Sequence, residues 1–274
     1  MPFTDKLDAV STKNKSLVCV GLDTDTAKIP AHLRSEPNPV LAFNRAIIEA
    51  TADIAQSYKL NIAFYEALGR DAHETIMRTL EAIPADVVTI GDGKRGDIGN
   101  TSAMYAAALF DGFGFDAVTV APYMGFDSVQ PFLAHKDKGV FILTLTSNKG
   151  SRDFQYLDVA GRPLYEHVLD KILSWNEAGN CGLVVGATHP SELAAIRATA
   201  GDVPILIPGL GAQGGEVEAS VRAGVTPAGL RGVFNSSRGI LYASGGLDFA
   251  EKAREAAIAL RDEINAALPS ASSQ

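Results

Sequence analysis

Short apolar runs alternate with longer amphipathic stretches along the whole chain. Eight runs of strand length occur, at residues 17–22, 60–64, 87–91, 117–121, 140–145, 181–185, 204–207 and 232–234. Between them, apolar residues recur at helical spacing, as over residues 40–54, 72–83, 164–175 and 249–264. Continuous apolar runs indicate buried strands, and the longer periodic stretches indicate helices. The alternation predicts a parallel sheet covered by helices.

The number of strand–helix units favours closure of that sheet. Eight units in a chain of 274 residues fit one (β/α)8 TIM barrel of the α/β class. A doubly wound open sheet is the alternative, and length alone would also allow two domains. No Pro/Ser-rich linker divides the sequence, so we expect one domain over residues 1–274 with a short, disordered C-terminal tail.

Charged residues gather where the third apolar run ends, in the sequence DGKRGD at residues 92–97. Side chains two residues apart on a strand share a face, so Asp92 and Lys94 are expected to face together, with Asp97 just past the strand end. A lysine between two carboxylates stays protonated, because opposite charge favours the charged form. Such a lysine suits a proton donor that faces a developing anion. It suits a Schiff base poorly, because that role needs a lowered pKa.

A structural ion network is the other interpretation of these three residues. Their position beside glycines at a strand end favours function, because (β/α)8 barrels carry their chemistry at the carboxyl ends of the strands. Asp23 follows the first run and the sequence TSNKG, residues 146–150, follows the fifth. Lys59 stands at the opening of the second run. Taken alone, Asp23 is best interpreted as a helix-cap or turn residue, and Lys59 as a lysine at the entry of a strand that shields the rim of the barrel.

Two glycine-rich turns follow the last two runs, PGLGAQGG at residues 208–215 and NSSRG at residues 235–239. Glycines let the backbone approach an anion, and Arg238 adds a fork of donors. Loops after strands seven and eight commonly bind phosphate in such barrels. Residues 209–214 also match the dinucleotide pattern GxGxxG. They follow the seventh strand, however, and no acidic residue ends the eighth, so we favour a phosphate site over a nicotinamide site.

The composition limits the classes of molecule that this protein is expected to bind. The formal net charge of −8 argues against nucleic acid or an anionic membrane as the main partner, and is compatible with a phosphorylated small molecule. We expect a cytoplasmic protein, because neither a secretory signal nor a run long enough to cross a bilayer is present.

The two cysteines, Cys19 and Cys181, are predicted to be reduced thiols in the core. The five histidines share no metal-ligand spacing, so we predict no metal site.

The motif D-x-K-x-x-D-I-G-N-T at residues 92–101 resembles the signature of the orotidine 5′-phosphate decarboxylase family. The resemblance covers nearly the whole chain, through the segments GLD at 21–23, YKLNIAFYE at 58–66, PGLGAQGG at 208–215 and SRG at 237–239. The length and residues 58–66 resemble the longer bacterial subgroup. The resemblance implies a (β/α)8 homodimer that converts orotidine 5′-monophosphate to uridine 5′-monophosphate and CO2 in de novo pyrimidine biosynthesis, without metal or organic cofactor.

The resemblance also implies residue roles. Asp92 would lie near the departing carboxylate, and Lys94 would face C6 and deliver its proton. Lys59 and Asp23 would complete an alternating charge network and hold the ribose hydroxyls. Asp97 and Thr101 would reach the substrate from the neighbouring subunit. Ser147 would contact the pyrimidine. The phosphate would be bound by Gln213, Arg238 and Gly239. A one-residue shift would give the pyrimidine contact to Thr146.

Two rival functions fit the same barrel. A metal-dependent sugar-phosphate decarboxylase or aldolase can share the D-x-K-x-x-D spacing, and a chelator would abolish its activity. A non-catalytic barrel would bind a phosphorylated metabolite without turnover.

Overall fold

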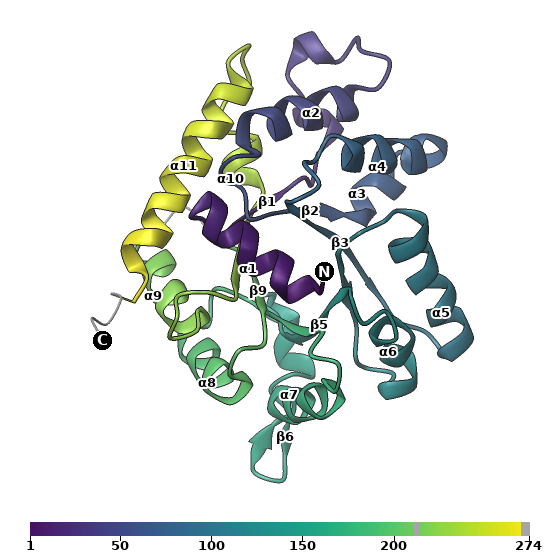
Figure 1. The fold of residues 1–274 in the computed structure, drawn as a ribbon, viewed down its shortest axis with the longest axis vertical. Helices are drawn as coiled ribbons and strands as arrows, with labels where there is room; N and C mark the ends of the chain where they lie inside the picture. The colour runs from purple at the N-terminus through teal and green to yellow at the C-terminus, as the bar shows by residue number, and fades with distance from the viewer. Residues whose placement is uncertain (211–213, 270–274) are drawn as a thin grey trace.

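The chain folds into a closed barrel of eight parallel strands surrounded by helices (Figure 1). The computed structural model describes residues 1–210 and 214–269. The barrel strands, in chain order, are β1 (Val18–Gly21), β2 (Ser57–Asn61), β3 (Val88–Arg95), β4 (Ala117–Val120), β5 (Gly139–Leu145), β8 (Cys181–Val185), β9 (Ile205–Pro208) and β10 (Gly232–Ser236). β1 pairs with β10 to close the barrel, which confirms the (β/α)8 prediction and excludes the open sheet.

Helices follow the strands and cover the outside of the barrel. They are α2 (Pro39–Thr51), α3 (Ile62–Glu66), α4 (Ala72–Glu81), α5 (Gly99–Ala107), α6 (Phe126–Leu133), α7 (Leu164–Trp175), α8 (Pro190–Ala200), α9 (Gly214–Gly224), α10 (Arg238–Leu241) and α11 (Phe249–Ala267). A small hairpin, β6 (Asp158–Val159) and β7 (Arg162–Pro163), interrupts the connection from β5 to α7. Among residues 1–210 and 214–269, no helix is both long and apolar enough to cross a membrane.

Local sequence sets the helix limits. α2 begins at Pro39, and the Asn38 side chain caps it by accepting the Leu41 N–H at 3.0 Å. Proline suits the first helical position because it has no N–H to leave unpaired there, and asparagine at the N-cap accepts one of the unpaired N–H groups of the first turn. The apolar face of α2 is then fully buried at residues such as Phe43 and Ile47, and the Phe43 ring stacks on Tyr242 and on Phe249 of α11. The helical spacing of apolar residues is therefore what buries one face of α2 in the hydrophobic core.

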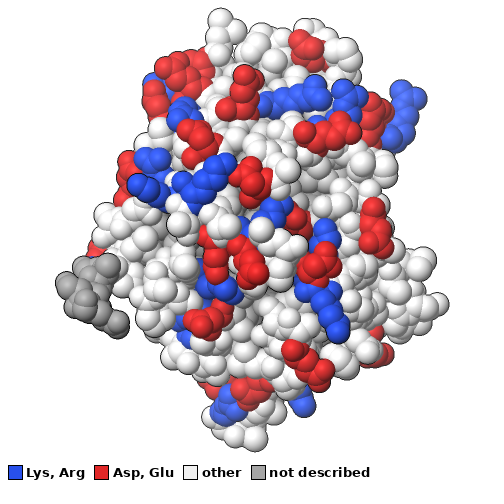
Figure 2. Space-filling model, in the orientation of Figure 1, with Lys and Arg blue, Asp and Glu red and all other residues white. Residues whose placement is uncertain are grey.

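An additional helix, α1 (Phe3–Asn14), closes the amino-terminal end of the barrel and lies in front of it in Figure 1. The Phe3 ring packs edge-on against Phe141, with the ring centroids 5.6 Å apart. Lys6 pairs with Asp116 at 2.7 Å. Figure 2 shows this face, where Lys and Arg side chains are interspersed with Asp and Glu. The opposite end of the barrel, where the strands finish, is left for the site.

Two predicted strands differ from the structure. The second was expected over residues 60–64, but β2 ends at Asn61 and Ile62 begins α3. Asn61 ends the strand because its side chain accepts the Ala63 N–H at 3.3 Å, as a helix cap does. Lys59 therefore lies in the middle of β2 and not at its opening. The third strand was expected to end at residue 91, but β3 continues to Arg95.

Candidate active site

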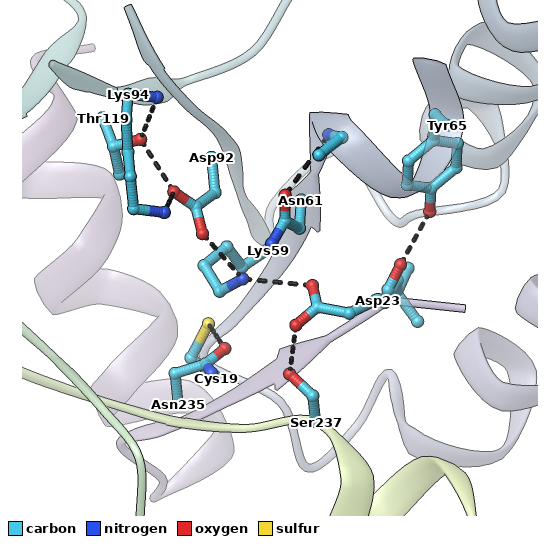
Figure 3. A network of polar contacts seen from close by, with 12 residues as sticks. Cys19, Asp23, Lys59, Asn61, Tyr65, Asp92, Lys94, Thr119, Asn235 and Ser237 are labelled. Atoms are coloured by element: carbon cyan, nitrogen blue, oxygen red, sulfur yellow. Dashed lines mark hydrogen bonds and ion pairs between the residues drawn. The ribbon is translucent and has the colours of Figure 1, made fainter. Parts of the chain in front are cut away.

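Four side chains from three neighbouring strands form a chain of alternating charge, which we call the charge network (Figure 3). Lys59 Nζ on β2 lies 3.1 Å from Asp23 Oδ1, just after β1, and 3.1 Å from Asp92 Oδ2 on β3. Lys94 Nζ lies 2.6 Å from the other Asp92 oxygen, Oδ1. Each carboxylate thus accepts from at least one lysine, and the two acids and two amines alternate across the carboxyl ends of the strands.

The inner part of the charge network is buried. The Lys59 side chain is 4% exposed and that of Asp92 is 9% exposed. Burial alone would raise the pKa of the Asp92 carboxyl, but Lys59, Lys94 and hydrogen bonds from Lys94 and Thr119 outweigh it and lower the pKa to about 2. For Lys59, burial would lower the pKa of the amine, but the adjacent Asp23 and Asp92 outweigh it and raise the pKa. Both groups are therefore charged at neutral pH.

The outer end of the charge network is open. The Lys94 side chain is 47% exposed, so its amine is held by Asp92 on one side and faces the barrel mouth on the other. The network lines a cavity of about 210 Å³, together with Asn61 of β2 and Asn235 of β10. An exposed cation beside a fixed carboxylate in a cavity can meet a substrate and move a proton to it.

Lys94 differs from the sequence prediction in two respects. It was expected between Asp92 and Asp97, but within this chain the lysine that two carboxylates bracket is Lys59. Within the described residues Asp97 forms no ion pair with Lys94, and its carboxylate accepts the Ile98 N–H at 2.7 Å just before α5. Lys94 also does not follow Asp92 on a regular strand, because its backbone has φ of 46° and β3 bulges there. The two side chains meet through this bulge.

Asp23 connects the charge network to the last strand. Its Oδ2 accepts a hydrogen bond from Ser237 Oγ at 2.7 Å. The close approach depends on Gly21, because a Cβ there would lie 2.0 Å from Ser237 Oγ. The loop after β1 is also fixed by Tyr242, whose hydroxyl accepts the Asp25 N–H at 2.8 Å. Asp23 is therefore held between strands from the two ends of the chain.

A second, larger cavity of about 890 Å³ opens beside Asp23 and Asn235, which line both cavities. Arg238 and Gly239, at the start of α10, line it and are exposed. These positions agree with an anion site next to the charge network. Gln213, the third predicted phosphate contact, lies outside the described residues.

The structure also places the remaining predicted residues. Thr101 lies on the first turn of α5, close in sequence to Asp97. The Thr146 hydroxyl is engaged by Asn148 at 2.6 Å and by Gln155 at 2.8 Å. Ser147 is exposed at the end of β5, and its hydroxyl lies 3.9 Å from the point that a Cβ on Gly209 would occupy. Because the Thr146 hydroxyl is already engaged and Ser147 is exposed, this geometry favours Ser147 over Thr146 for a contact to a ligand.

Thr119 of β4 is a site residue that the sequence did not predict. It is 1% exposed, accepts the Lys94 N–H at 2.9 Å and donates to Asp92 Oδ1 at 2.8 Å. A signal was present, because Thr119 is a polar residue between Val118 and Val120 in an otherwise apolar run. Buried polar side chains of this kind need partners, and here the partners are site residues.

Metal-ligating side chains do not gather at this site. In the described part of the chain, no group of three or more His, Cys, Asp or Glu side chains is arranged to hold a metal ion. Cys19 and Cys181 are buried and free, in agreement with the prediction of two core thiols. Burial raises the pKa of the Cys19 thiol to about 12, so it stays neutral beside Lys59.

Comparison with known proteins identifies the family. A family model described as orotidine 5′-phosphate decarboxylase / HUMPS family matches residues 16–255. Proteins named orotidine 5′-phosphate decarboxylase from Azoarcus sp. (strain BH72) and Janthinobacterium sp. (strain Marseille) are 51% and 50% identical to this chain. The alignments cover 97% of this chain and 99% and 98% of those proteins.

Solved structures agree with this assignment. The structure of Leishmania donovani OMP decarboxylase superposes with a TM-score of 0.84 at 38% identity, over 97% of this chain and 98% of that one. The structure of Leishmania donovani UMP synthase gives a TM-score of 0.85 at 40% identity, over 97% of this chain and 56% of that one. By its sequence, its fold and the strand-end motifs that carried the resemblance, this chain belongs to the orotidine 5′-phosphate decarboxylase family.

Proposed function

We propose that this chain decarboxylates orotidine 5′-monophosphate to uridine 5′-monophosphate and CO2 in de novo pyrimidine biosynthesis, and we keep the cytoplasm as its predicted location. The observation that carries the proposal is the Lys94 amine, fixed 2.6 Å from Asp92 and open to the barrel mouth, in a chain of this family. The metal-dependent alternative is not favoured, because the relatives across the full chain length are orotidine 5′-phosphate decarboxylases.

Lys94 supplies the two things that the reaction lacks in water. Loss of CO2 leaves an electron pair on C6, with no adjacent group able to delocalise it well. A fixed ammonium about 4 Å away stabilises such a charge by roughly 4 kcal/mol at an effective dielectric constant near 20. Because Lys94 is already held by Asp92, it need not reorganise as the charge develops. The same amine then donates a proton to C6, which completes the product.

The neighbouring charges assist Lys94. Asp92 would lie beside the substrate carboxylate, and the repulsion between the two anions would be relieved as CO2 departs. Lys59 lies 3.1 Å from Asp92 and holds it in place, and it lies at the same distance from Asp23. Lys59 and Asp23 would together contact the ribose hydroxyls. Binding of the remote phosphate adds energy that positions the ring over Lys94.

The other contacts follow the layout of the two cavities. Ser147 would contact the pyrimidine from the end of β5. Arg238 and Gly239, in the larger cavity, would bind the phosphate, and we retain Gln213 as the third phosphate contact by resemblance. The cavity at the charge network and the cavity at α10 adjoin at Asp23 and Asn235, which line both of them. The substrate would therefore lie across this shared boundary.

We also propose a homodimer in which Asp97 and Thr101 of each subunit complete the other subunit's site. Over the residues that the structure describes, Asp97 forms no ion pair with the Lys94 of its own chain, and the Lys94 side chain is 47% exposed. Around these residues, α5 and the adjacent α6 region expose large apolar side chains, namely Ile98, Met104, Tyr123, Met124 and Phe126. Exposed apolar surface of this kind marks protein–protein contacts. A partner seated on it would bring its own Asp97 toward Lys94.

The proposed activity is tested by following the loss of orotidine 5′-monophosphate absorbance, with and without a chelator. We expect turnover in both samples, with equal rates. Activity that disappears with the chelator would point to the metal-dependent alternative. Nucleotide binding without turnover would point to the non-catalytic barrel.

Arg238→Ala is expected to raise KM for the substrate by about 10- to 100-fold, because a hydrogen bond to a charged group contributes roughly 1.5–3 kcal/mol. The kcat at saturation should change much less, because Arg238 lies away from the charge network. Steady-state kinetics measures both constants. The control is Arg222→Ala on α9, which removes an exposed arginine paired with Glu218. A KM equal to that of the control would move the phosphate site elsewhere.

A further inference from the structure

β3 bulges at the site, and a single residue of β4 faces the bulge. Gly91 pairs with Val118 and Arg95 pairs with Val120, with a register shift between them. Residues 92–94 of β3 thus stand opposite Thr119 alone. A bulge removes the regular backbone partners of the extra residues and redirects their side chains, often at active sites.

The Thr119 side chain takes over part of the missing pairing. Its hydroxyl accepts the Lys94 N–H at 2.9 Å and donates to Asp92 Oδ1 at 2.8 Å, so it binds both ends of the bulge (Figure 3). A hydroxyl offers one donor and two acceptor sites, which is what this double contact needs. A hydrocarbon side chain of the same shape could do neither.

The backbone of Lys94 requires such a hold. Its φ of 46° is in the left-handed region, which a side chain with a Cβ adopts at a cost. Strained residues persist only when their surroundings fix them, and they occur at functional sites. At Lys94 the amine is fixed by Asp92, and the backbone N–H is fixed by Thr119.

We propose that Thr119 is a positioning residue for the decarboxylation: its hydroxyl holds the β3 bulge so that the Lys94 amine and the Asp92 carboxylate present one fixed geometry to the substrate. The inference rests on the proposed function, because it assumes that these two groups act on the substrate. Thr119 itself acts through them. Its contribution should therefore appear in the chemical step more than in substrate affinity.

Thr119→Val keeps the shape and removes the hydroxyl. We expect kcat to fall by about 10- to 100-fold, the usual consequence of leaving hydrogen-bonding groups at a site unpaired, while KM changes by less than about threefold. Thr119→Ser restores the hydroxyl and should recover kcat to within about threefold of the wild type. The control is Thr144→Val on β5, a buried threonine whose hydroxyl donates to the Ile142 carbonyl. A purely structural role would lower the melting temperature of Thr119→Val and leave the kcat of the folded protein unchanged.

Amide hydrogen exchange tests the same contact without turnover. The Lys94 amide should exchange slowly in the wild type, in Thr119→Ser and in Thr144→Val, and at least about tenfold faster in Thr119→Val. If the wild type exchanges this amide rapidly, or if Thr119→Val keeps full kcat, the proposal is wrong. Should Thr119→Val not fold, Thr119→Ala and the wild-type exchange rate decide in the same way. A wild type that does not turn over orotidine 5′-monophosphate contradicts the proposed function, while slow exchange at Lys94 would still support the hold by Thr119.

Discussion

Lys94→Ala is expected to lower turnover by at least about 10⁴-fold, because it removes the proton donor and the cation that faces the developing charge. The fold should survive. Lys94 lies at the open end of the charge network, half exposed, and Asp92 keeps its contact to Lys59 at 3.1 Å. Because Asp92 keeps a second lysine and only the Lys94 side of the pair is open to solvent, the loss should cost less than the roughly 3–5 kcal/mol typical of breaking a fully buried pair. Product formation and a thermal melt of the same sample measure the two effects.

The control for this variant is Lys13→Ala, which removes an exposed lysine of α1 paired with Asp86. It should keep full turnover, because α1 covers the opposite end of the barrel. Near-normal turnover by folded Lys94→Ala would remove Lys94 from the mechanism.

The same variant tests the shared site. Asp97→Ala should also be inactive, but by a defect located in the other subunit's site. Mixing equal amounts of Lys94→Ala and Asp97→Ala should restore about a quarter of the wild-type activity, because half of the reassorted dimers carry one intact site. A mixture as inactive as its components, with exchange of subunits shown by mass spectrometry, would place Asp97 in its own subunit's site or outside any site.

Lys59→Met is expected to cost both activity and stability. The amine is almost fully buried, and it neutralises Asp23 and Asp92 at once. Removing one partner from a buried ion pair leaves an uncompensated charge and typically costs 3–5 kcal/mol. Turnover should fall with it, because Asp92 loses one of the two contacts that hold its carboxylate.

The stability loss should depend on pH. In the wild type the lowered pKa of Asp92, about 2, means that its ionised form stabilises the fold above the unfolded pKa near 3.9, and that this stability disappears as the pH falls toward 2. Lys59 makes the largest of the contributions that lower the pKa of Asp92, so without it this pKa rises from its wild-type value. The uncompensated charge therefore destabilises the variant at neutral pH. This destabilisation ends once the Asp92 carboxyl is protonated.

Urea unfolding at pH 7 and at pH 4.5 measures this dependence, and the difference between wild type and Lys59→Met should be larger at pH 7. The double variant Lys59→Met/Asp92→Asn should regain part of the stability at pH 7 and none of the activity. A stability difference that is equal at both pH values would show that packing, and not charge, is the main contribution of Lys59.

The strand–helix order was predictable because each barrel strand is buried on both faces and each helix on one. These two burial patterns leave different periods in the sequence, and α7, for example, has the predicted limits of residues 164–175. The end of β2 was not predictable from hydrophobicity, because residues 62–64 are as apolar in α3 as in a strand. The cap formed by Asn61 decides it, and a cap depends on local geometry.

The part of the candidate site that lies at strand ends was predictable from the sequence. Motifs at strand ends located the charge network, since parallel strands finish at one edge. They could not show which lysine lies between two acids, because that depends on the register between β1, β2 and β3. The role of Thr119 depends on a bulge between β3 and β4. Contacts of this kind are set by pairing between strands, which one sequence does not record.

The link from Asp23 to Ser237 joins residues 214 positions apart, across the seam where the first and last strands pair. Long-range contacts of this kind form late, because the intervening chain must be ordered first. During synthesis on the ribosome, a growing polypeptide that has not yet released residues 232–239 lacks one wall of its own catalytic centre. Activity thus begins only after residues 232–239 have been made, and a product terminated before them is inert however well its earlier strands have folded.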